Sequence, residues 1–511
     1  MGSYSTIAEL ITQGSDIAPA IIAPQSLPLT YRGLRQLVAS VAVELKRLGI
    51  GRNGRVAIVL PNGPEMAAAF VAISAAATAA PLNPAYKQNE FEFYLTDLKA
   101  QALIVEADAK TPAREVGSRL GIPIIELFPQ RSAGAGSFVL KPLAPATVIP
   151  AVADSAEPDD IALVLHTSGT TSRPKIVPLT QRNVTASARH IVDSLALTPS
   201  DVSLNIMPLF HIHGLIAAVL SSLAAGATVC CTPGFDAFKF FGWLDEIKPS
   251  WWTAVPTMHQ AILDRAGRQR EIIARTRLRF IRSSSASLPP QVMRALEETF
   301  HCPVIEAYGM TEAAHQMAVN PLPPRARKAG SVGLAGGPEI AIMDVDGALL
   351  ASGEVGEVVI RGPNVTPGYE ANPTANAAAF TNGWFRTGDQ GVIDNEGYLR
   401  LTGRLKELIN RGGEKVSPLE VDDVLMDHPA VAQAVTFAMP HGKLGEEVAA
   451  AVVLREGMNA VERDLRDFCS TRLAAFKVPR RIVILGEIPK GATGKLQRIG
   501  LAEKLGLVIR T

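Results

Sequence analysis

Short apolar runs, many of them β-branched, alternate with helical patterns over the first three quarters of this 511-residue chain. Such runs predict buried strands, and the segments between them space their apolar residues as one face of a helix does. Strands that alternate with helices predict parallel or mixed sheets covered by helices, an α/β fold. The clearest strands are expected at Val56–Leu60, Ala102–Val105, Ile161–Leu165, Val202–Met207, Trp252–Val255 and Phe280–Arg282, and the clearest helices at Tyr31–Leu48, Asn183–Ala196 and Gln291–Phe300.

The character of the chain changes toward its C-terminal end. Short strand patterns separated by Gly and Asp turns predict a small β-barrel or antiparallel-sheet subdomain at about 335–402. Later strand and helix patterns predict a small α+β domain at 408–511, and the charged, Gly-containing segment 403–407 between them suits a hinge. We therefore expect a large N-terminal domain at 1–402, a hinge, and a small mobile C-terminal domain.

Composition narrows the class of protein. Hydrophobic residues make up 47% and charged residues 19%, as in a well-cored globular protein. The net charge of +1 argues against nucleic acid as a partner. Four cysteines without a CxxC pair, and no secretion signal, favour a cytoplasmic protein with reduced thiols. The Ala-rich stretches Met66–Leu82 and Leu215–Cys231 approach the length of a membrane span, but they lack flanking basic residues, so we expect buried helices there and no span.

The segment His166–Pro178 reads HTSGTTSRPKIVP and carries the strongest chemical signal. Small hydroxyl residues and Gly let backbone N–H groups and hydroxyls converge on an anion, and Arg173 and Lys175 add positive charge. These properties predict a polyphosphate-binding loop, with an ordinary Ser/Thr-rich surface loop as the alternative. The loop is not a Walker A sequence, because Pro174 follows Gly169 where that motif has its second Gly.

Four more motifs follow in order: EAYGMTE at Glu306–Glu312, WFRTGD at Trp384–Asp389, GRLKE at Gly403–Glu407 and KGATGKLQR at Lys490–Arg498. Together with the phosphate loop, they resemble the acyl-adenylate-forming, AMP-dependent synthetase and ligase superfamily over essentially the whole chain. The resemblance implies that a carboxylate attacks the α-phosphate of ATP to give acyl-AMP and pyrophosphate, after which the thiol of CoA displaces AMP. It therefore implies ATP, Mg²⁺ and CoA as cofactors and co-substrate, and catalysis by positioning and charge neutralisation.

The resemblance also implies roles for individual residues. Tyr308 would stack on adenine, Asp389 would accept the ribose hydroxyls, and Arg404 would assist from the hinge side. Thr311 would bond the α-phosphate, and Glu312 would be the Mg²⁺ ligand. The full set of expected ATP-binding residues is Thr167, Ser168, Gly169, Thr170, Thr171, Lys175, Ser284, Ser285, Ala286, Glu306, Ala307, Tyr308, Gly309, Asp389 and Arg404. The chain departs from the family pattern at Ser172 and Ile176, where Gly is usual.

By the same resemblance, Lys495 lies over the reacting carboxylate and α-phosphate and is the principal catalytic residue, acting with Thr311, Glu312 and His211. Since Lys495 belongs to the C-terminal domain, that domain must pack on the ATP site for adenylation. It would then rotate about Lys406, and Gly412 and Gly413 would line the channel for the pantetheine arm of CoA.

The expected acyl pocket is rich in His and Ser, from the stretches FHIHG, RSSSAS and TEAAHQM. Since pockets for fatty or phenylpropanoid acids are mostly apolar, this composition favours a small, polar carboxylic acid. The expected acyl-binding residues are His211, His213, Ser283, Ser285 and His315. The runs HTSGTTSRP, FIRSSSASL, INRGGEKVSP and LAAFKVP further resemble the oxalate–CoA ligase subgroup of the superfamily.

Three alternatives to an oxalate-type ligase remain open from the residues. The first alternative is a CoA ligase for another small, medium-chain or aromatic acid. The second is a nucleotide-binding member without catalysis, and the third is a unit that loads a carrier protein. Intact Glu312, Asp389 and Lys495 argue against the second. No carrier domain follows Thr511, so CoA is the expected acceptor.

Overall fold

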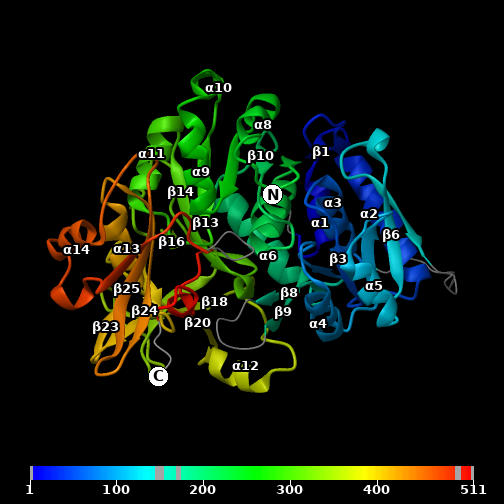
Figure 1. The fold of residues 1–511 in the computed structure, drawn as a ribbon. Helices are drawn as coiled ribbons and strands as arrows, with labels where there is room; N and C mark the ends of the chain where they lie inside the picture. The colour runs from blue at the N-terminus through cyan, green and yellow to red at the C-terminus, as the bar shows by residue number, and fades with distance from the viewer. Residues whose placement is uncertain (1–3, 144–154, 168–173, 490–495, 508–511) are drawn as a thin grey trace.

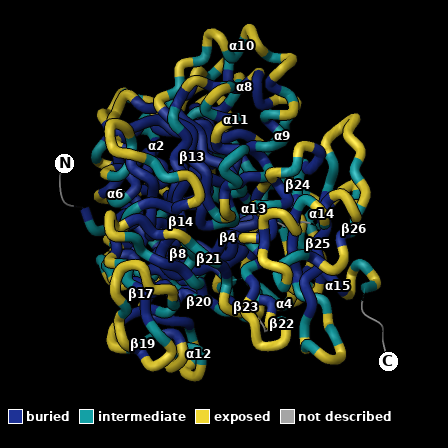
Figure 2. The backbone as a smooth tube through the Cα atoms, turned by 90° about the vertical axis from the view of Figure 1, so that its left-hand side faces the viewer, coloured by how far each residue is buried: buried dark blue, intermediate teal, exposed yellow. Residues whose placement is uncertain are grey.

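The computed structural model describes residues 4–143, 155–167, 174–489 and 496–507. Within these ranges the larger of two central sheets has nine strands, and its middle six strands run parallel. Their order across the sheet is β16 (Leu334–Ala335), β15 (His315–Val319), β14 (Val304–Met310), β13 (Phe280–Ser284), β12 (Trp251–Ala254), β10 (Val202–Asn205), β11 (Thr228–Cys231), β1 (Pro19–Ile22) and β2 (Leu29–Thr30). In Figure 2, β13 and β14 run through the buried interior.

The second central sheet has seven strands in the described part of the chain. Five neighbouring strands are parallel, and the outer strands β7 and β9 are antiparallel to their neighbours. The order is β7 (Phe138–Pro142), β6 (Ile124–Pro129), β5 (Ala102–Glu106), β3 (Arg55–Val59), β4 (Thr78–Pro81), β8 (Ile161–Thr167) and β9 (Lys175–Thr180). Figure 1 shows most of this sheet on the side of the molecule opposite the C-terminal helices.

Helices fill the space around and between the two sheets. Helix α6 (Gln181–Ser194) contacts β8 and β9 of one sheet and β15 of the other, so it joins the two layers. The other helices in this part are α1 (Ile7–Leu10), η1 (Ile11–Gln13), α2 (Tyr31–Arg47), α3 (Pro64–Ser74), α4 (Gln88–Leu98), α5 (Pro112–Arg119), η2 (Arg131–Ala133), the π-helix η3 (His213–Leu220), α7 (Ser221–Ala224), α8 (Phe240–Ile247), α9 (Pro256–Ala266), α10 (Arg270–Arg275), α11 (Pro290–Phe300) and η4 (Thr311–Ala313).

Each Ala-rich stretch contains the expected buried helix, and a strand follows that helix within the same stretch. Helix α3 ends at Ser74, and β4 follows within the first stretch. In the second, η3 and α7 lead into β11 through Gly226, which has a φ of +68°. A Cβ there would lie 2.9 Å from the carbonyl oxygen of Gln13, so the turn needs Gly. None of the helices described is long and apolar enough to cross a membrane.

A smaller antiparallel sheet follows the nine-stranded sheet along the chain. Among the described residues its five strands are β17 (Glu339–Met343), β18 (Gly356–Arg361), β19 (Phe380–Thr381), β20 (Trp384–Ile393) and β21 (Leu399–Arg404), with α12 (Pro373–Ala379) before β19. The register of β20 and β21 places Asp389 opposite Arg404. This pairing brings two of the predicted site residues together.

The C-terminal end is a separate α+β unit, which Figure 1 shows in orange and red. Its sheet has the order β23 (Glu414–Val416), β22 (Ile409–Arg411), β25 (Gly445–Leu454) and β24 (Val431–His441), and β26 (Arg481–Ile484) pairs in parallel with β25. Its helices are α13 (Pro418–Met426), α14 (Glu462–Ser470), η5 (Ala475–Lys477) and α15 (Leu501–Lys504). The predicted fold class, large mixed sheets with helices and a small α+β unit, is confirmed.

Candidate active site

Asp389 is the centre of a buried polar group at the junction of the large and small sheets. The hydroxyl of Tyr308, on β14, donates to Asp389 Oδ2 at 2.5 Å, and Nε of Arg404 donates to Asp389 Oδ1 at 2.8 Å. Burial and the neighbouring Asp389 charge raise the pKa of Tyr308, and the same carboxylate raises the pKa of Arg404. Two donors from separate strands therefore hold the Asp389 carboxyl group in one orientation.

Glu312 forms a second group with Tyr369 and Lys175. The hydroxyl of Tyr369 donates to Glu312 Oε1 at 2.8 Å, and Lys175 Nζ lies 4.2 Å from the centre of the Tyr369 ring. Burial raises the pKa of Glu312, while the Tyr369 hydrogen bond and the charges of Arg404 and Lys175 oppose that rise. The predicted carboxylate and cation thus contact the same aromatic side chain, the first at its hydroxyl and the second over its ring.

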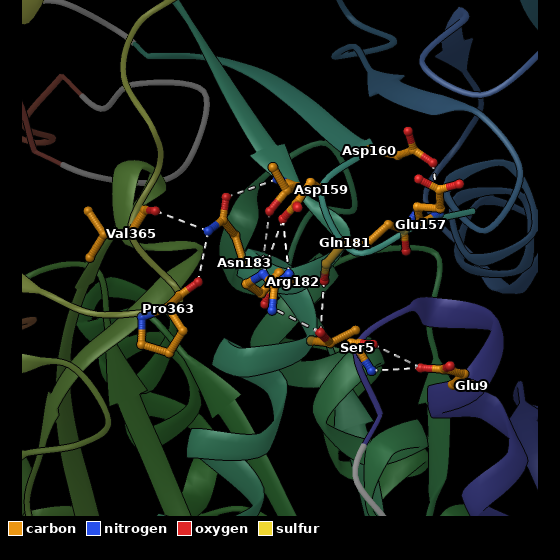
Figure 3. A network of polar contacts seen from close by, with 12 residues as sticks. Ser5, Glu9, Glu157, Asp159, Asp160, Gln181, Arg182, Asn183, Pro363 and Val365 are labelled. Atoms are coloured by element: carbon orange, nitrogen blue, oxygen red, sulfur yellow. Dashed lines mark hydrogen bonds and ion pairs between the residues drawn. The ribbon is translucent and has the colours of Figure 1, made fainter.

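The start of α6 ties this group to the rest of the fold. Asn183 Nδ2 donates to the carbonyl oxygens of Pro363 at 2.8 Å and Val365 at 3.0 Å, as Figure 3 shows. Its Oδ1 accepts the backbone N–H of Thr180 at 2.9 Å, so one side chain also caps the helix. The adjacent Thr366 donates its N–H to the carbonyl oxygen of Glu312 at 2.7 Å. Asn183 therefore helps to position the Glu312 backbone.

The small-residue loop after β13 is held by β14. Ser284 Oγ donates to the carbonyl oxygen of Ala307 at 2.8 Å, and the backbone N–H of Leu288 donates to Glu306 Oε1 at 2.9 Å. Between them Ser285 has a φ of +74°, which is uncommon for a residue other than Gly, and Ala286 is exposed. Burial raises the pKa of Glu306 to about 8. Glu306, predicted among the ATP-binding residues, lies beneath this loop and supports it.

Gly309 is required by a close approach of two antiparallel strands. A Cβ at this position would lie 1.7 Å from the carbonyl oxygen of His315. The chain reverses through Thr311–Ala313, and the φ angles of Ala314 and His315 are +46° and +99°. This strained reversal brings His315, at the start of β15, back beside the end of β14.

Three of the predicted acyl-binding residues form one cluster, in which His213 and His315 are buried and Ser285 is half-buried. His213 Nδ1 lies 3.0 Å from Ser285 Oγ, its Nε2 lies 2.6 Å from Thr253 Oγ1, and its ring centre lies 5.0 Å from that of His315. His213 begins the π-helix η3, a form that often marks functional sites. His211 is half-buried, and its Nδ1 accepts the N–H of His213 at 3.4 Å.

Ser283, the fifth predicted acyl residue, is not brought into this cluster. It is fully buried on β13, one residue after Arg282. Since side chains alternate along a strand, Ser283 lies on the sheet face opposite Arg282. Arg282 in turn contacts Thr253, the partner of His213.

Arg282 itself was missed by the sequence analysis. It is fully buried, with Nη1 at 3.4 Å from Thr253 Oγ1 and Nη2 at 3.3 Å from Gln316 Oε1. Burial lowers the pKa of its guanidinium to about 9. A basic residue within the apolar run Phe280–Arg282 was the available signal, because a charge on a buried strand is rare without a ligand or partner. Thr253, Gln316 and Tyr369 carried no comparable signal.

The remaining predicted residues belong to the phosphate loop, the expected hinge and the C-terminal domain. Ser168, Gly169, Thr170, Thr171 and Lys495 lie outside the described residues. Thr167 ends β8 and pairs with Lys175 at the start of β9, so the two described ends of the phosphate loop are neighbours. Lys406 is exposed between β21 and β22, and Gly412 and Gly413, with φ of +60° and +98°, form the turn of the β22–β23 hairpin.

Comparison with known proteins identifies the family. The model of the AMP-binding enzyme family matches residues 14–370, and that of the AMP-binding enzyme C-terminal domain matches residues 420–495. The chain therefore belongs to the AMP-binding enzyme family. Within that family it is an AMP-forming acyl-CoA synthetase, which uses ATP and CoA.

Three relatives illustrate this assignment. The chain is 48% identical to a probable CoA ligase of Humulus lupulus, with 95% of this chain and 93% of that protein covered. It is also 48% identical to an oxalate–CoA ligase of Arabidopsis thaliana, with 92% of each covered. The ATP-bound crystal structure of MatB from Rhodopseudomonas palustris superposes with a TM-score of 0.87 at 27% identity, covering 98% of this chain and 99% of that one.

Proposed function

We propose that this synthetase converts oxalate, ATP and CoA to oxalyl-CoA, AMP and pyrophosphate. The main support for this proposal is the polar character of the cluster of His213, His315 and Ser285. A pocket for a fatty or aromatic acid would need apolar walls there. The Arabidopsis thaliana relative, named oxalate–CoA ligase, supports the same substrate. Imidazole and hydroxyl groups are suited to the oxygens of a small acid.

In this proposal the two polar groups of the site take separate tasks. Asp389, held by Tyr308 and Arg404, accepts the ribose hydroxyls of ATP. Lys175 faces the phosphates leaving as pyrophosphate, and Lys495 offsets the charge that develops as the acid attacks the α-phosphate. The protein thereby supplies positioning and charge neutralisation for the transfer.

Glu312 is the proposed contact for Mg²⁺. No cluster of three or more His, Cys, Asp or Glu that could hold a metal was found among the described residues. A single carboxylate still fits Mg²⁺, because this ion keeps several waters and binds through one or two carboxylates together with substrate phosphates. Glu312 offers Oε2 for that purpose, since its Oε1 accepts the Tyr369 hydroxyl. Bound Mg²⁺ would neutralise phosphate charge.

We further propose that residues 1–402 and 408–511 act as two domains joined by a hinge at 403–407. Lys406 is exposed between β21 and β22, where a change of backbone angles would meet little packing resistance. The C-terminal domain would carry Lys495 to the ATP site for the first half-reaction. It would then present the Gly412–Gly413 turn to CoA for the second.

The test is a panel of acids assayed for pyrophosphate release with and without CoA: oxalate, malonate, hexanoate and 4-coumarate. We expect oxalate to have the highest kcat/KM and to yield a CoA thioester. Strong turnover of hexanoate or 4-coumarate without oxalate turnover would contradict the proposal that oxalate is the substrate. Pyrophosphate release without thioester formation would indicate a carrier protein as acceptor, and no release with any acid would favour a nucleotide-binding member without catalysis.

A further inference from the structure

Arg282 is a fully buried cation that forms no ion pair with any described residue. Its contacts are two long hydrogen bonds to neutral oxygens, at 3.4 Å to Thr253 and 3.3 Å to Gln316, and its Nε has no hydrogen-bond partner in the described part of the chain. Burial lowers the pKa of its guanidinium to about 9. The charge of Arg282 is therefore unmatched within the described protein.

The neighbours of Arg282 connect it to the acyl cluster. Thr253 Oγ1 lies between Arg282 Nη1 and His213 Nε2, which is 2.6 Å from the same oxygen. On the other side Gln316 follows His315 on β15, and Gln316 Nε2 donates to Ser194 Oγ at 2.7 Å and the Gly336 carbonyl oxygen at 3.0 Å. The guanidinium of Arg282 thus contacts β12 and β15, and Thr253 connects it to the first turn of η3.

A cation taken out of water without a counter-ion is unfavourable for folding. Elsewhere in the described protein, half-buried Arg404 contacts Asp389 and half-buried Arg498 contacts Asp422. The cluster around Arg282, in contrast, contains imidazoles, hydroxyls and an amide. An anion bound beside His213 would supply the missing negative charge in a low-dielectric site, where attraction is strong.

We propose that Arg282 determines specificity for an acid with a second carboxylate, because its guanidinium provides, across Thr253 and His213, the positive charge that balances the non-reacting carboxylate. This inference rests on the proposed function and deepens it, because it names the residue that distinguishes oxalate from an acid with one carboxylate. It assigns to Arg282 selectivity between acids and no part in the chemistry at the α-phosphate. It also explains why a strand in the interior of the large sheet carries a cation.

The test compares oxalate with oxamate, an isosteric acid in which an uncharged amide replaces one carboxylate. We would measure kcat/KM for pyrophosphate release, and binding of both acids by calorimetry with a non-hydrolysable ATP analogue present. In Arg282→Gln, we expect kcat/KM for oxalate to fall by about 100-fold, since opposite charges attract strongly in a low-dielectric site even without direct contact. The value for oxamate should change by less than about threefold.

Matched variants separate charge from folding. Arg277→Gln removes the same charge at an exposed site on the approach to the same strand, and should leave both acids unchanged. Arg282→Lys keeps the charge and should recover at least about a tenth of the wild-type oxalate value. Without substrate, Arg282→Gln should unfold at or above the wild-type temperature, because it removes an uncompensated buried charge, whereas a structural role would lower that temperature.

Two outcomes decide between the proposals. If wild-type protein acts on oxalate but Arg282→Gln keeps its preference for oxalate over oxamate to within about tenfold, the role of Arg282 is overturned while the proposed function stands. If wild-type protein forms no oxalyl-CoA, the proposed function is wrong, and the role of Arg282 in oxalate selectivity is wrong with it. A collapse of the preference by more than about tenfold, with rescue by Lys, supports the role.

Discussion

The candidate active site has a nucleotide half around Asp389 and Glu312 and an acyl half around His213 and Arg282. The two halves differ in whether their charged groups are paired. At the nucleotide half, Asp389 is matched by Arg404, and Glu312 and Lys175 both contact Tyr369, one at its hydroxyl and the other over its ring. At the acyl half, Arg282 is buried among neutral groups and has no carboxylate within ion-pair distance among the described residues. The acyl half is built on the nine-stranded sheet, whereas the nucleotide half also takes Asp389 and Arg404 from the small sheet and Lys175 from the second central sheet.

This difference separates orientation from selectivity. A charge that is already paired is held in one geometry before the ligand arrives, so it can orient a substrate without reorganisation. A buried charge left unpaired is a liability for stability and a source of affinity for the anion that completes it. The nucleotide half is therefore prepared for a ligand common to the whole family, and the acyl half for one particular acid.

The largest effect is expected from Lys495→Ala, which removes the cation proposed to act where the two halves meet. Formation of acyl-AMP should fall by about a thousandfold or more, because no other group would offset charge at the α-phosphate. Thioester formation from supplied acyl-AMP and CoA should be largely retained. Single-turnover assays of each half-reaction provide the measurement. Equal loss in both would remove Lys495 from its proposed place.

Asp389→Ala tests the paired half. Loss of this carboxylate leaves Tyr308 and Arg404 without their common acceptor, so kcat/KM for ATP should fall by about 100-fold. The KM for oxalate should change by less than about twofold, because the acyl half is built separately. Asp394→Ala is the control: it lies just beyond the same strand, in a surface ion pair with Lys328 at 2.6 Å. A comparable change in the oxalate KM would show that the halves are not independent.

Lys406→Pro should slow thioester formation by about tenfold while changing adenylation by less than about threefold, because proline restricts the backbone angle that the proposed hinge must change. Lys406→Ala removes the same charge but keeps backbone freedom, and should behave as wild type. Separate measurement of the two half-reaction rates in both variants shows whether backbone freedom at Lys406 is required. Identical kinetics in Pro and Ala variants would locate the domain movement outside 403–407.

The smallest effect is a pH dependence of stability at Glu306, the buried acid beneath the loop that joins the two halves. Its pKa is raised by burial from 4.5 to about 8, so the folded protein holds this proton more tightly than the unfolded chain does. The contribution of Glu306 to stability is therefore greatest below about pH 4.5 and declines as the pH rises toward 8. Above that pH the folded protein carries a buried charge.

Glu306→Gln should consequently raise the unfolding temperature at pH 9 by a few degrees, roughly 2–5 °C, and by much less at pH 5. The amide keeps an oxygen for the N–H of Leu288. Thermal unfolding across this pH range gives the comparison, with the exposed Glu298→Gln as control. A difference that is constant with pH would mean that Glu306 stays in one protonation state.

Most strands of the central sheets were predictable, because each is marked by its own local run of apolar residues. The predicted strand at Ala102–Val105 is β5, and that at Phe280–Arg282 is β13, extended by two residues. In the Ala-rich stretches the buried helices were predicted but the strands that follow them were not, since Ala is compatible with a helix or a buried strand and gives no period to distinguish them. Tertiary pairing in the two large sheets decided where each helix ends.

The chemistry of the chain is determined by its sequence: ordered motifs with fixed small, aromatic and charged residues specify an acyl-adenylate former before any fold is known. The tertiary structure alone decided how those residues are used. Thr253, Arg282, Gln316 and His213 come from β12, β13, β15 and η3, and nothing in their local patterns indicates that they meet. The physical reason is that burial and charge matching depend on neighbours across the sheet, whereas periodicity reports only on the segment that carries it.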